Sequence, residues 1–248
     1  RIGTLTLCNS FRNPALIAKM AASLDVISNG RLLFGIGAGW KEHEYDAYGY
    51  PFPSGKIRLD QLEEAVQIIK RLWTEREATF KGKHYQIDSA FCSPKPIQKP
   101  HPPILVGGHG EKRTLKIVAE HADMCNFTFQ VGQELDRLLD KLRGHCKKAG
   151  RDYDSVRKTF FALCMISEDQ GEVDALIARG AESRGISFEE NRKRLSDLPG
   201  AWIGTPEAVR EKCEYLIQKG FSLFQIRFDF QREVDMARVF SKSVMSKV

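Results

Sequence analysis

The sequence predicts an α/β protein in which helices cover a parallel β-sheet, as in a TIM (β/α)8 barrel, with one domain over residues 1–248. Strand-length apolar runs alternate with amphipathic helical segments, and the runs are apolar on both faces, as buried parallel strands are. About six strand-helix units can be counted. A doubly wound open sheet also holds six strands. Because the chain enters directly in a strand without an initiating Met, we expect a barrel that lacks about its first two βα units.

The N-terminal elements are predicted from their boundaries. A β-rich run from Ile2 to Leu7 comes first, and Asn13-Pro14 then places a capping residue before a proline at the first helical position. The helix that follows ends at Asn29-Gly30, which supplies the left-handed residue common after helices. Its apolar stripe consists of Leu16, Ile17, Met20, Ala21 and Leu24. A strand is predicted next over Arg31 to Ile36, and it runs into a series of glycines.

The rest of the chain repeats the alternation of strands and helices. Helical spacing of apolar residues, with acids early and bases late, predicts a helix over Arg58 to Trp73, which a small hairpin follows. A proline-rich segment leads into a strand at Ile104-Leu105-Val106. The remaining predictions are helices over about 111–121 and 133–148, strands over about 123–127 and 159–166, a polar helical stretch over about 172–195, a helix from Thr205 to Gly220, a strand over 223–228 and a closing helix from about 233.

Composition excludes several classes of protein. The net charge is +6, but Lys and Arg are spread among acids instead of gathering with aromatic residues, so nucleic-acid binding is not expected. No apolar run approaches the roughly 18 residues that cross a bilayer, and no basic-then-apolar leader is present, so we expect a cytoplasmic protein without membrane contact. The six cysteines form no C-x-x-C pair, which favours reduced thiols and no metal site.

The first glycine motif, Gly35-Ile36-Gly37-Ala38-Gly39-Trp40, follows a predicted strand. It fails as a dinucleotide-binding fingerprint because Trp40 stands where the third glycine is required. A glycine-rich strand end still lets a flat ligand approach the backbone, and the carboxyl ends of barrel strands are where TIM barrels bind ligands. A plain tight turn is the alternative interpretation.

The second glycine motif, Gly107-Gly108-His109-Gly110, follows a strand and runs into a helix, so bare amides and a helix N-terminus would face a ligand there. This pattern favours a phosphate site, with a flexible βα turn as the alternative, and no G-K-[ST] closes it as a Walker motif. Among the histidines, His43 follows the first glycine motif and is the candidate for acid-base work. A surface histidine that caps a helix fits the same position.

Three motifs stand out when they are taken together: Arg12-Asn13-Pro14-Ala15-Leu16, Leu24-Asp25-Val26-Ile27-Ser28-Asn29-Gly30-Arg31-Leu32 and the run from Gly35 to Trp40. This combination resembles the luciferase-like monooxygenase superfamily. The continuation is most similar to the branch that uses the deazaflavin coenzyme F420: Glu44-Tyr45, Ala47-Tyr48-Gly49-Tyr50-Pro51-Phe52-Pro53, Arg58-Leu59, Pro94-Lys95-Pro96 and Gly107-Gly108. The resemblance implies a TIM barrel of the bacterial luciferase-like type.

The resemblance also implies roles for single residues. Thr6 to Cys8 match the strand end that supports the coenzyme ring, His43 matches a polar position at the ring, and Trp40 matches the active-site wall. Trp40 stands where sugar-phosphate dehydrogenases of the family carry an acid, which argues against that reaction. The predicted catalytic residues are therefore His43 and Trp40, and the predicted cofactor-binding residues are Thr6, Cys8, Gly37, Ala38, His43, Gly107, Gly108, Gly110 and Thr128.

The resemblance implies an oxidoreductase that transfers a hydride between coenzyme F420 and an unidentified small organic substrate. Two alternatives stay open. One is a monooxygenase that uses reduced FMN, and the other is a non-catalytic remnant that binds a flavin or a partner chain. Relatives in the family are often dimers, so a homodimer is the assembly to test.

Overall fold

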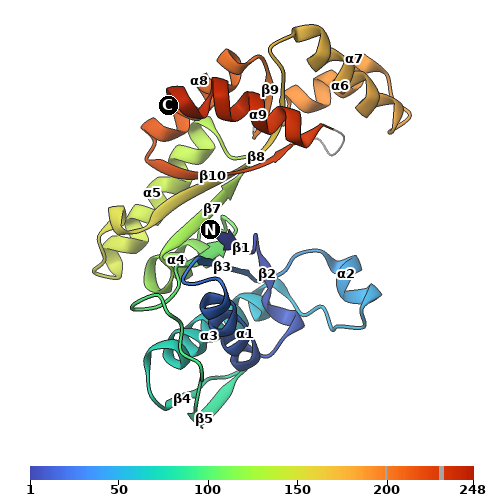
Figure 1. Ribbon diagram of the computed structural model, residues 1–248. Coiled ribbons are helices and arrows are strands. Elements are labelled where there is room, and N and C mark those ends of the chain that lie inside the picture. Colours follow the sequence, from blue (N-terminus) through green and yellow to red (C-terminus); the bar gives the residue numbers. More distant parts are fainter. Residues whose placement is uncertain (199, 229–231) are drawn as a thin grey trace. The chain divides into compact units, whose positions relative to one another are not determined.

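The computed structural model describes residues 1–198, 200–228 and 232–248 (Figure 1). The chain divides into two compact units, one of Arg1–Asn126 with Leu138–Val156 and the other of Phe127–Arg137 with Arg157–Val248. Each unit is an α/β structure and is described by itself. Within the described residues, no helix combines the length and the apolar character that a membrane crossing requires.

The first unit contains a parallel sheet whose strands end at a common edge. Its strands are β1 (Ile2–Gly3), β2 (Leu7–Cys8), β3 (Leu32–Gly37), β6 (Ile104–Gly107) and β7 (Met124–Thr128), of which β7 continues into the second unit. The strands β1 and β2 both pair with β3, which pairs with β6, which pairs with β7. The run predicted as one strand is thus two short strands, and the peptide bond between Leu5 and Thr6, which separates them, is cis.

Helix α1 (Pro14–Ile27) begins where the sequence predicts, because Asn13 Oδ1 accepts a hydrogen bond from Ala15 N at 2.8 Å. Its predicted apolar stripe is partly wrong, since Leu16, Met20 and Leu24 lie exposed. The buried face is made instead of Pro14, Ile17, Ala18, Ala21, Ala22 and Asp25. Small alanines let α1 approach α3 closely, so that Trp73 Nε1 donates to Ala18 O at 2.9 Å.

Helix α3 (Gly55–Thr74) begins three residues before the predicted start, because Ser54 Oγ accepts a hydrogen bond from Ile57 N and caps it. It buries Leu62, Ala65, Val66, Ile68, Ile69, Leu72 and Trp73. Further elements of this unit are the 3-10 helix Asn9–Phe11, α2 (Glu42–Ala47), the predicted hairpin of β4 (Ala78–Lys81) and β5 (Gln86–Ala90), α4 (Thr114–His121) and the 3-10 helix Tyr153–Ser155. Residues 111–113, predicted as helix, form a turn before α4.

The second unit is built around β8 (Arg157–Ile166), which pairs in parallel with both β9 (Ala201–Gly204) and β10 (Phe221–Phe228). Its helices are α6 (Gln170–Glu182), α7 (Phe188–Ser196), α8 (Pro206–Gln218) and α9 (Glu233–Ser243), followed by the 3-10 helix Met245–Lys247, and α5 (Gly132–Lys148) contributes residues to both units. The polar stretch predicted as helical is two helices, α6 and α7, because Gly185 turns the chain at φ 64°.

Strand β9 is absent from the predicted elements because it has four residues between a polar helix and a helix cap. Its side chains nevertheless pack in the core of this unit. Trp202 is 1% exposed and stacks on Phe160, with ring centroids 6.3 Å apart, and on Phe240 of α9.

Candidate functional site

The candidate site lies at the carboxyl edge of the parallel sheet in the first unit. The registers place Cys8 opposite Gly37 and Ile36 opposite Val106, so β2, β3 and β6 end side by side. Thr6, which immediately precedes β2, joins these ends. A Cβ atom on Gly37 would lie 2.9 Å from Thr6 Oγ1, and one on Gly107 would lie 2.8 Å from Thr6 Cγ2.

This contact brings together three residues that the sequence predicts at the cofactor. Because real Cβ atoms do not approach other atoms that closely, Gly37 and Gly107 are glycines to make room for the exposed Thr6 side chain. The strand ends therefore present backbone and one hydroxyl group.

The loop after β3 is held in place by Tyr45 of α2. Its hydroxyl donates to Ala38 O at 3.3 Å and lies 3.1 Å from Cys8 Sγ, so it ties α2 to the ends of both β2 and β3. Gly39 sits directly beneath it at φ 78°. A Cβ atom there would lie 1.9 Å from the Tyr45 hydroxyl and 2.6 Å from Cys8 Sγ. Glycine is therefore required at position 39 by both backbone conformation and space.

Arg58 of α3 holds the same loop from the other side. Its Nε donates to Gly39 O at 3.2 Å, its Nη1 donates to Pro53 O, and its guanidinium lies 3.9 Å from the centroid of the Phe52 ring. Phe52 in turn packs edge-on against Tyr45, with centroids 4.8 Å apart. The peptide oxygens of Ala38 and Gly39 thus both have donors, which leaves this rim preorganised.

Burial keeps the Tyr45 hydroxyl protonated. Desolvation, followed by its hydrogen bond with Cys8, raises the pKa of Tyr45 to about 12. Its ring is 1% exposed and packs against Phe11 as well as Phe52. At neutral pH this phenol is a hydrogen-bond donor that positions the loop, and it does not serve as a base.

The second glycine motif forms an exposed loop between β6 and α4. Gly108 has φ 112°, a conformation that favours glycine, and Gly108, His109 and Gly110 are all exposed. Thr114, the first residue of α4, packs beneath the loop, because a Cβ atom on Gly110 would lie 2.9 Å from its Oγ1. Backbone N–H groups at the start of a helix favour anions, so this loop has the composition of a phosphate site.

Two basic residues follow this loop, and the structure separates their roles. The Arg113 Nη2 atom lies 2.5 Å from Asp60 Oδ1 and 3.1 Å from Glu63 Oε2 of α3. The hydrogen bond from Arg113 lowers the pKa of Asp60. Arg113 is therefore engaged in holding α4 on α3, whereas Lys112 is exposed.

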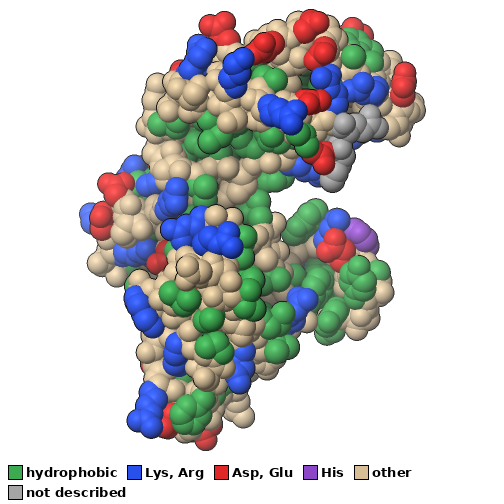
Figure 2. All heavy atoms as spheres, in the orientation of Figure 1, with side chains coloured by type: hydrophobic (Ala, Val, Ile, Leu, Met, Phe, Trp, Pro, Cys, Tyr) green, Lys and Arg blue, Asp and Glu red, His purple; other side chains and the backbone are tan. Residues whose placement is uncertain are grey.

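The two residues predicted to act in catalysis lie at the surface around α2. Trp40 is 79% exposed at the end of the glycine loop, and His43 lies exposed on the first turn of α2. Figure 2 shows a histidine at the surface over α2, among acidic and basic side chains. Within the described residues, no hydrogen bond or ion pair joins His43 to the strand ends. Thr128, the last residue of β7, belongs to the second unit, where its N–H donates to Gln130 Oε1 at 2.9 Å.

Sequence reasoning assigned no role to Tyr45, Arg58 or Thr114. Tyr45 carried a usable signal, since it is an aromatic residue within the polar run from Lys41 to Asp46 and must bury its ring while pairing its hydroxyl. Arg58 was visible only as part of the Arg58-Leu59 motif, and Thr114 carried no signal, because only the folding of α3 and α4 onto the sheet brings these residues to the loops.

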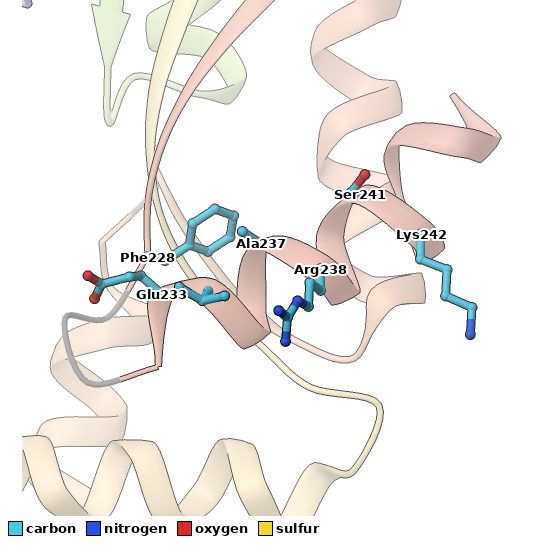
Figure 3. A pocket seen from close by; sticks show the side chains of 7 residues that line it. Phe228, Glu233, Ala237, Arg238, Ser241 and Lys242 are labelled. Carbon is cyan, nitrogen blue, oxygen red and sulfur yellow. The ribbon is translucent and has the colours of Figure 1, made fainter.

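Two other features of the described residues lie outside the candidate site. Ligand atoms of Glu63, Glu120 and His121 lie within 4.8 Å of one another, but the two carboxylates already have cationic partners. Lys116 Nζ lies 3.4 Å from Glu63 and 3.3 Å from Glu120, and Arg113 also pairs with Glu63. In the second unit, a shallow hollow of about 720 Å³ lies between Phe228 and α9 (Figure 3). None of the catalytic or cofactor-binding residues predicted from the sequence lines this hollow.

Sequence comparisons find similar proteins in one family. The family model described as luciferase-like monooxygenase matches residues 1–223. An FMNH2-dependent dimethylsulfone monooxygenase from Pseudomonas putida is 28% identical over 90% of this chain and 68% of its own length. An F420-dependent glucose-6-phosphate dehydrogenase from Amycolatopsis mediterranei is 30% identical over 79% of this chain and 61% of its own length.

Solved structures show the same fold. A coenzyme F420-dependent tetrahydromethanopterin reductase from Methanopyrus kandleri superposes with a TM-score of 0.79 at 19% identity, over 100% of this chain and 83% of that one. The fold is therefore the luciferase-like TIM-barrel type that the sequence predicts. The chain spans between 47% and 68% of the length of the curated relatives it matches.

Proposed function

The chain belongs to the luciferase-like monooxygenase family, and we propose that its activity is hydride transfer between coenzyme F420 and a small organic substrate. The observation that carries the proposal is the pair of glycine-rich strand ends joined by Thr6, next to the exposed glycine loop before α4. Flat rings need close approach to backbone, and phosphates need bare amides. This edge of the sheet offers both.

The residues present fit such a coenzyme. Thr6, Cys8, Gly37 and Ala38 would hold the ring, because positions 37 and 107 have no room for side chains that would stand over it. Gly107, Gly108 and Gly110 would hold the phosphate. When bound, the coenzyme supplies the carbon that accepts or donates the hydride, and the protein supplies position and electrostatics.

The chain's own residues would act by orientation. Tyr45 and Arg58 bind the carbonyl oxygens of Ala38 and Gly39, so the rim does not reorganise when a ligand arrives. His43 would donate to or accept from the ring or the substrate, and Trp40 would form the wall of the substrate site. A tryptophan in place of an acid at position 40 supports a substrate other than a sugar phosphate.

The alternative cofactor is reduced FMN, as in the name of the dimethylsulfone monooxygenase relative. Deazaflavin is favoured by the motifs from Glu44 to Pro53 and by the F420-dependent dehydrogenase relative. The two cofactors share a tricyclic ring and a phosphate, so the same strand ends would serve either.

Titration with each cofactor tests the proposal. We expect coenzyme F420 to quench tryptophan fluorescence with a Kd at least about tenfold below that of oxidised or reduced FMN, a difference of about 1.4 kcal/mol. Gly108→Ala, which strains the loop backbone, should raise this Kd about tenfold. Gly150→Ala is the matched control, because Gly150 has φ 66° with open space around it and lies outside the site. Tighter binding of FMN than of F420 would contradict the proposal.

His43→Gln tests whether this side chain reaches the coenzyme. A lost hydrogen bond is worth about 1 kcal/mol, so the Kd for F420 should rise about fivefold. Asp46→Asn, which alters another exposed residue of α2, should leave the Kd within twofold. Equal effects of the two substitutions would show that His43 does not contact the coenzyme, which would leave the strand-end residues and the glycine loops as the proposed contacts.

A further inference from the structure

Trp40 is a tryptophan whose ring lies in water directly beside the candidate site. It follows the glycine run at the end of β3, and it is 79% exposed. The other two tryptophans of the protein, Trp73 and Trp202, are 2% and 1% exposed and pack in the cores. An indole is a large apolar ring, and its contact with a ligand removes that ring from water. Core packing therefore does not account for a tryptophan at position 40.

The backbone that carries Trp40 is fixed to the strand ends. Arg58 Nε donates to Gly39 O at 3.2 Å, and this carbonyl belongs to the peptide group that joins Gly39 to Trp40. Gly39 itself lies against the Tyr45 hydroxyl and Cys8 Sγ, which leave no room for a Cβ atom there. The indole is thus presented from a preorganised position next to the ends of β2 and β3.

A second aromatic ring is exposed at the other end of α2. Tyr48 directly follows this helix and is 72% exposed. Among the residues that the structure describes, neither Trp40 nor Tyr48 stacks on another aromatic ring, whereas the nearby Tyr45 and Tyr50 both pack on Phe11. Figure 2 shows hydrophobic side chains at the surface on both sides of the charged side chains over α2. This surface therefore offers aromatic area that the fold does not use.

The two basic side chains next to Trp40 are already engaged. Lys41 Nζ lies 3.0 Å from Glu44 Oε1 and 6.0 Å from the centroid of the indole ring. The Arg58 guanidinium donates to the carbonyl oxygens of Gly39 and Pro53. An anionic group bound beside Trp40 would thus have to displace one of these contacts to gain a cationic partner.

The charges of α2 that remain are acidic. Glu42 and Asp46 are exposed and form no ion pair with any described residue. From Lys41 to Asp46 the chain carries one lysine and three acids, a formal charge of −2 with the histidine neutral. The field around the indole therefore repels negative charge.

We propose that Trp40 is a specificity-determining residue and that it selects an uncharged, predominantly apolar substrate. The inference rests on the proposed function, since the adjacent strand ends would hold the coenzyme beside the substrate. An apolar substrate gains from covering the indole. An anion would lose hydration without a free cation in return, and it would face Glu42 and Asp46. The chemistry of this rim thus excludes sugar phosphates and carboxylates as a class.

Equilibrium dialysis of the full chain with two probes of the same shape tests the selection. We expect 2-acetylnaphthalene, which is uncharged, to bind about tenfold more tightly than the anion 2-naphthoate. Trp40→Ala should raise the Kd of 2-acetylnaphthalene about tenfold, whereas Trp40→Phe, which keeps a ring, should raise it less than about threefold. Phe91→Ala is the matched control, because it removes another exposed aromatic ring of the first unit and should leave this Kd within about twofold.

A charge reversal tests the contribution of α2. Glu42→Lys should narrow the preference for the uncharged probe about threefold at low salt, and the difference should vanish near 1 M salt because exposed charges are screened. Glu77→Lys reverses an exposed acid beside β4 and should leave the preference unchanged. A preference that Glu42→Lys and Glu77→Lys alter equally would overturn the role of α2.

The location of the bound probe is read from the three indole N–H signals in a nitrogen-proton correlation spectrum. Only the signal that Trp40→Phe removes should shift when 2-acetylnaphthalene is added, because the Trp73 indole is buried and bonded to Ala18 O. Binding without this shift, or 2-naphthoate binding as tightly as 2-acetylnaphthalene, would overturn the inference while leaving coenzyme F420 binding untouched. The expected preference together with failure of F420 to bind would instead overturn the proposed function and uphold the apolar selection by Trp40.

Discussion

Gly39→Ala is expected to lower the free energy of unfolding by about 3 kcal/mol and to weaken coenzyme binding. An L-residue in the left-handed conformation costs about 1–2 kcal/mol. The added Cβ atom would also overlap the Tyr45 hydroxyl at 1.9 Å and displace it from Ala38 O and Cys8 Sγ, each a hydrogen bond worth about 1 kcal/mol. Urea unfolding followed by circular dichroism gives the change in stability.

Gly49→Ala separates these two causes. Gly49 has φ 71°, close to the value at Gly39, but nothing lies within 4 Å of its ideal Cβ position. Gly49→Ala should therefore lower the free energy of unfolding only by the cost of the left-handed backbone conformation, about 1 kcal/mol. The double variant Gly39→Ala/Tyr45→Phe should cost less than the sum of its single changes, because the phenylalanine removes the overlapping oxygen. Equal costs at positions 39 and 49 would show that Tyr45 does not constrain the loop.

Glu64→Ala is expected to lower the free energy of unfolding by about 3 kcal/mol. The Glu64 carboxylate accepts three backbone hydrogen bonds from the hairpin turn, from Lys83 N at 2.8 Å and from His84 N and Tyr85 N at 2.9 Å each. Hydrogen bonds to charged groups contribute about 1.5–3 kcal/mol apiece when buried, and these are partly exposed. The loss should appear in the urea midpoint and in faster amide exchange at these three residues.

Glu75→Ala is the matched control for Glu64. Glu75 directly follows the same helix, and its carboxylate pairs with the exposed Arg71 at 3.5 Å, a contact worth under about 0.5 kcal/mol. Glu64→Gln keeps one accepting oxygen. Its loss of unfolding free energy should therefore lie between those of Glu64→Ala and Glu75→Ala. If Glu64→Ala costs no more than Glu75→Ala, the turn does not depend on the carboxylate.

The sequence by itself determined most of the element order. Capping residues and turn glycines are local signals, so α1 begins at Asn13-Pro14 and the helix before Gly220 ends as predicted. Short elements were not predicted from the sequence. Strand β9 has too few residues for a periodic pattern, and its role depends on Trp202 packing against residues distant in the chain.

The candidate site divides in the same way. Both glycine motifs and their position at strand ends follow from the sequence, because residue type and a preceding apolar run are visible there. Only the tertiary structure decided why those glycines are needed, since Thr6 packs across Gly37 and Gly107, and Tyr45 covers Gly39. Only the tertiary structure likewise shows that Arg113 pairs with carboxylates of α3, whereas Lys112 lines an open hollow beside α5. Two adjacent basic residues look alike in sequence, and their surroundings on α3 and α5 separate them.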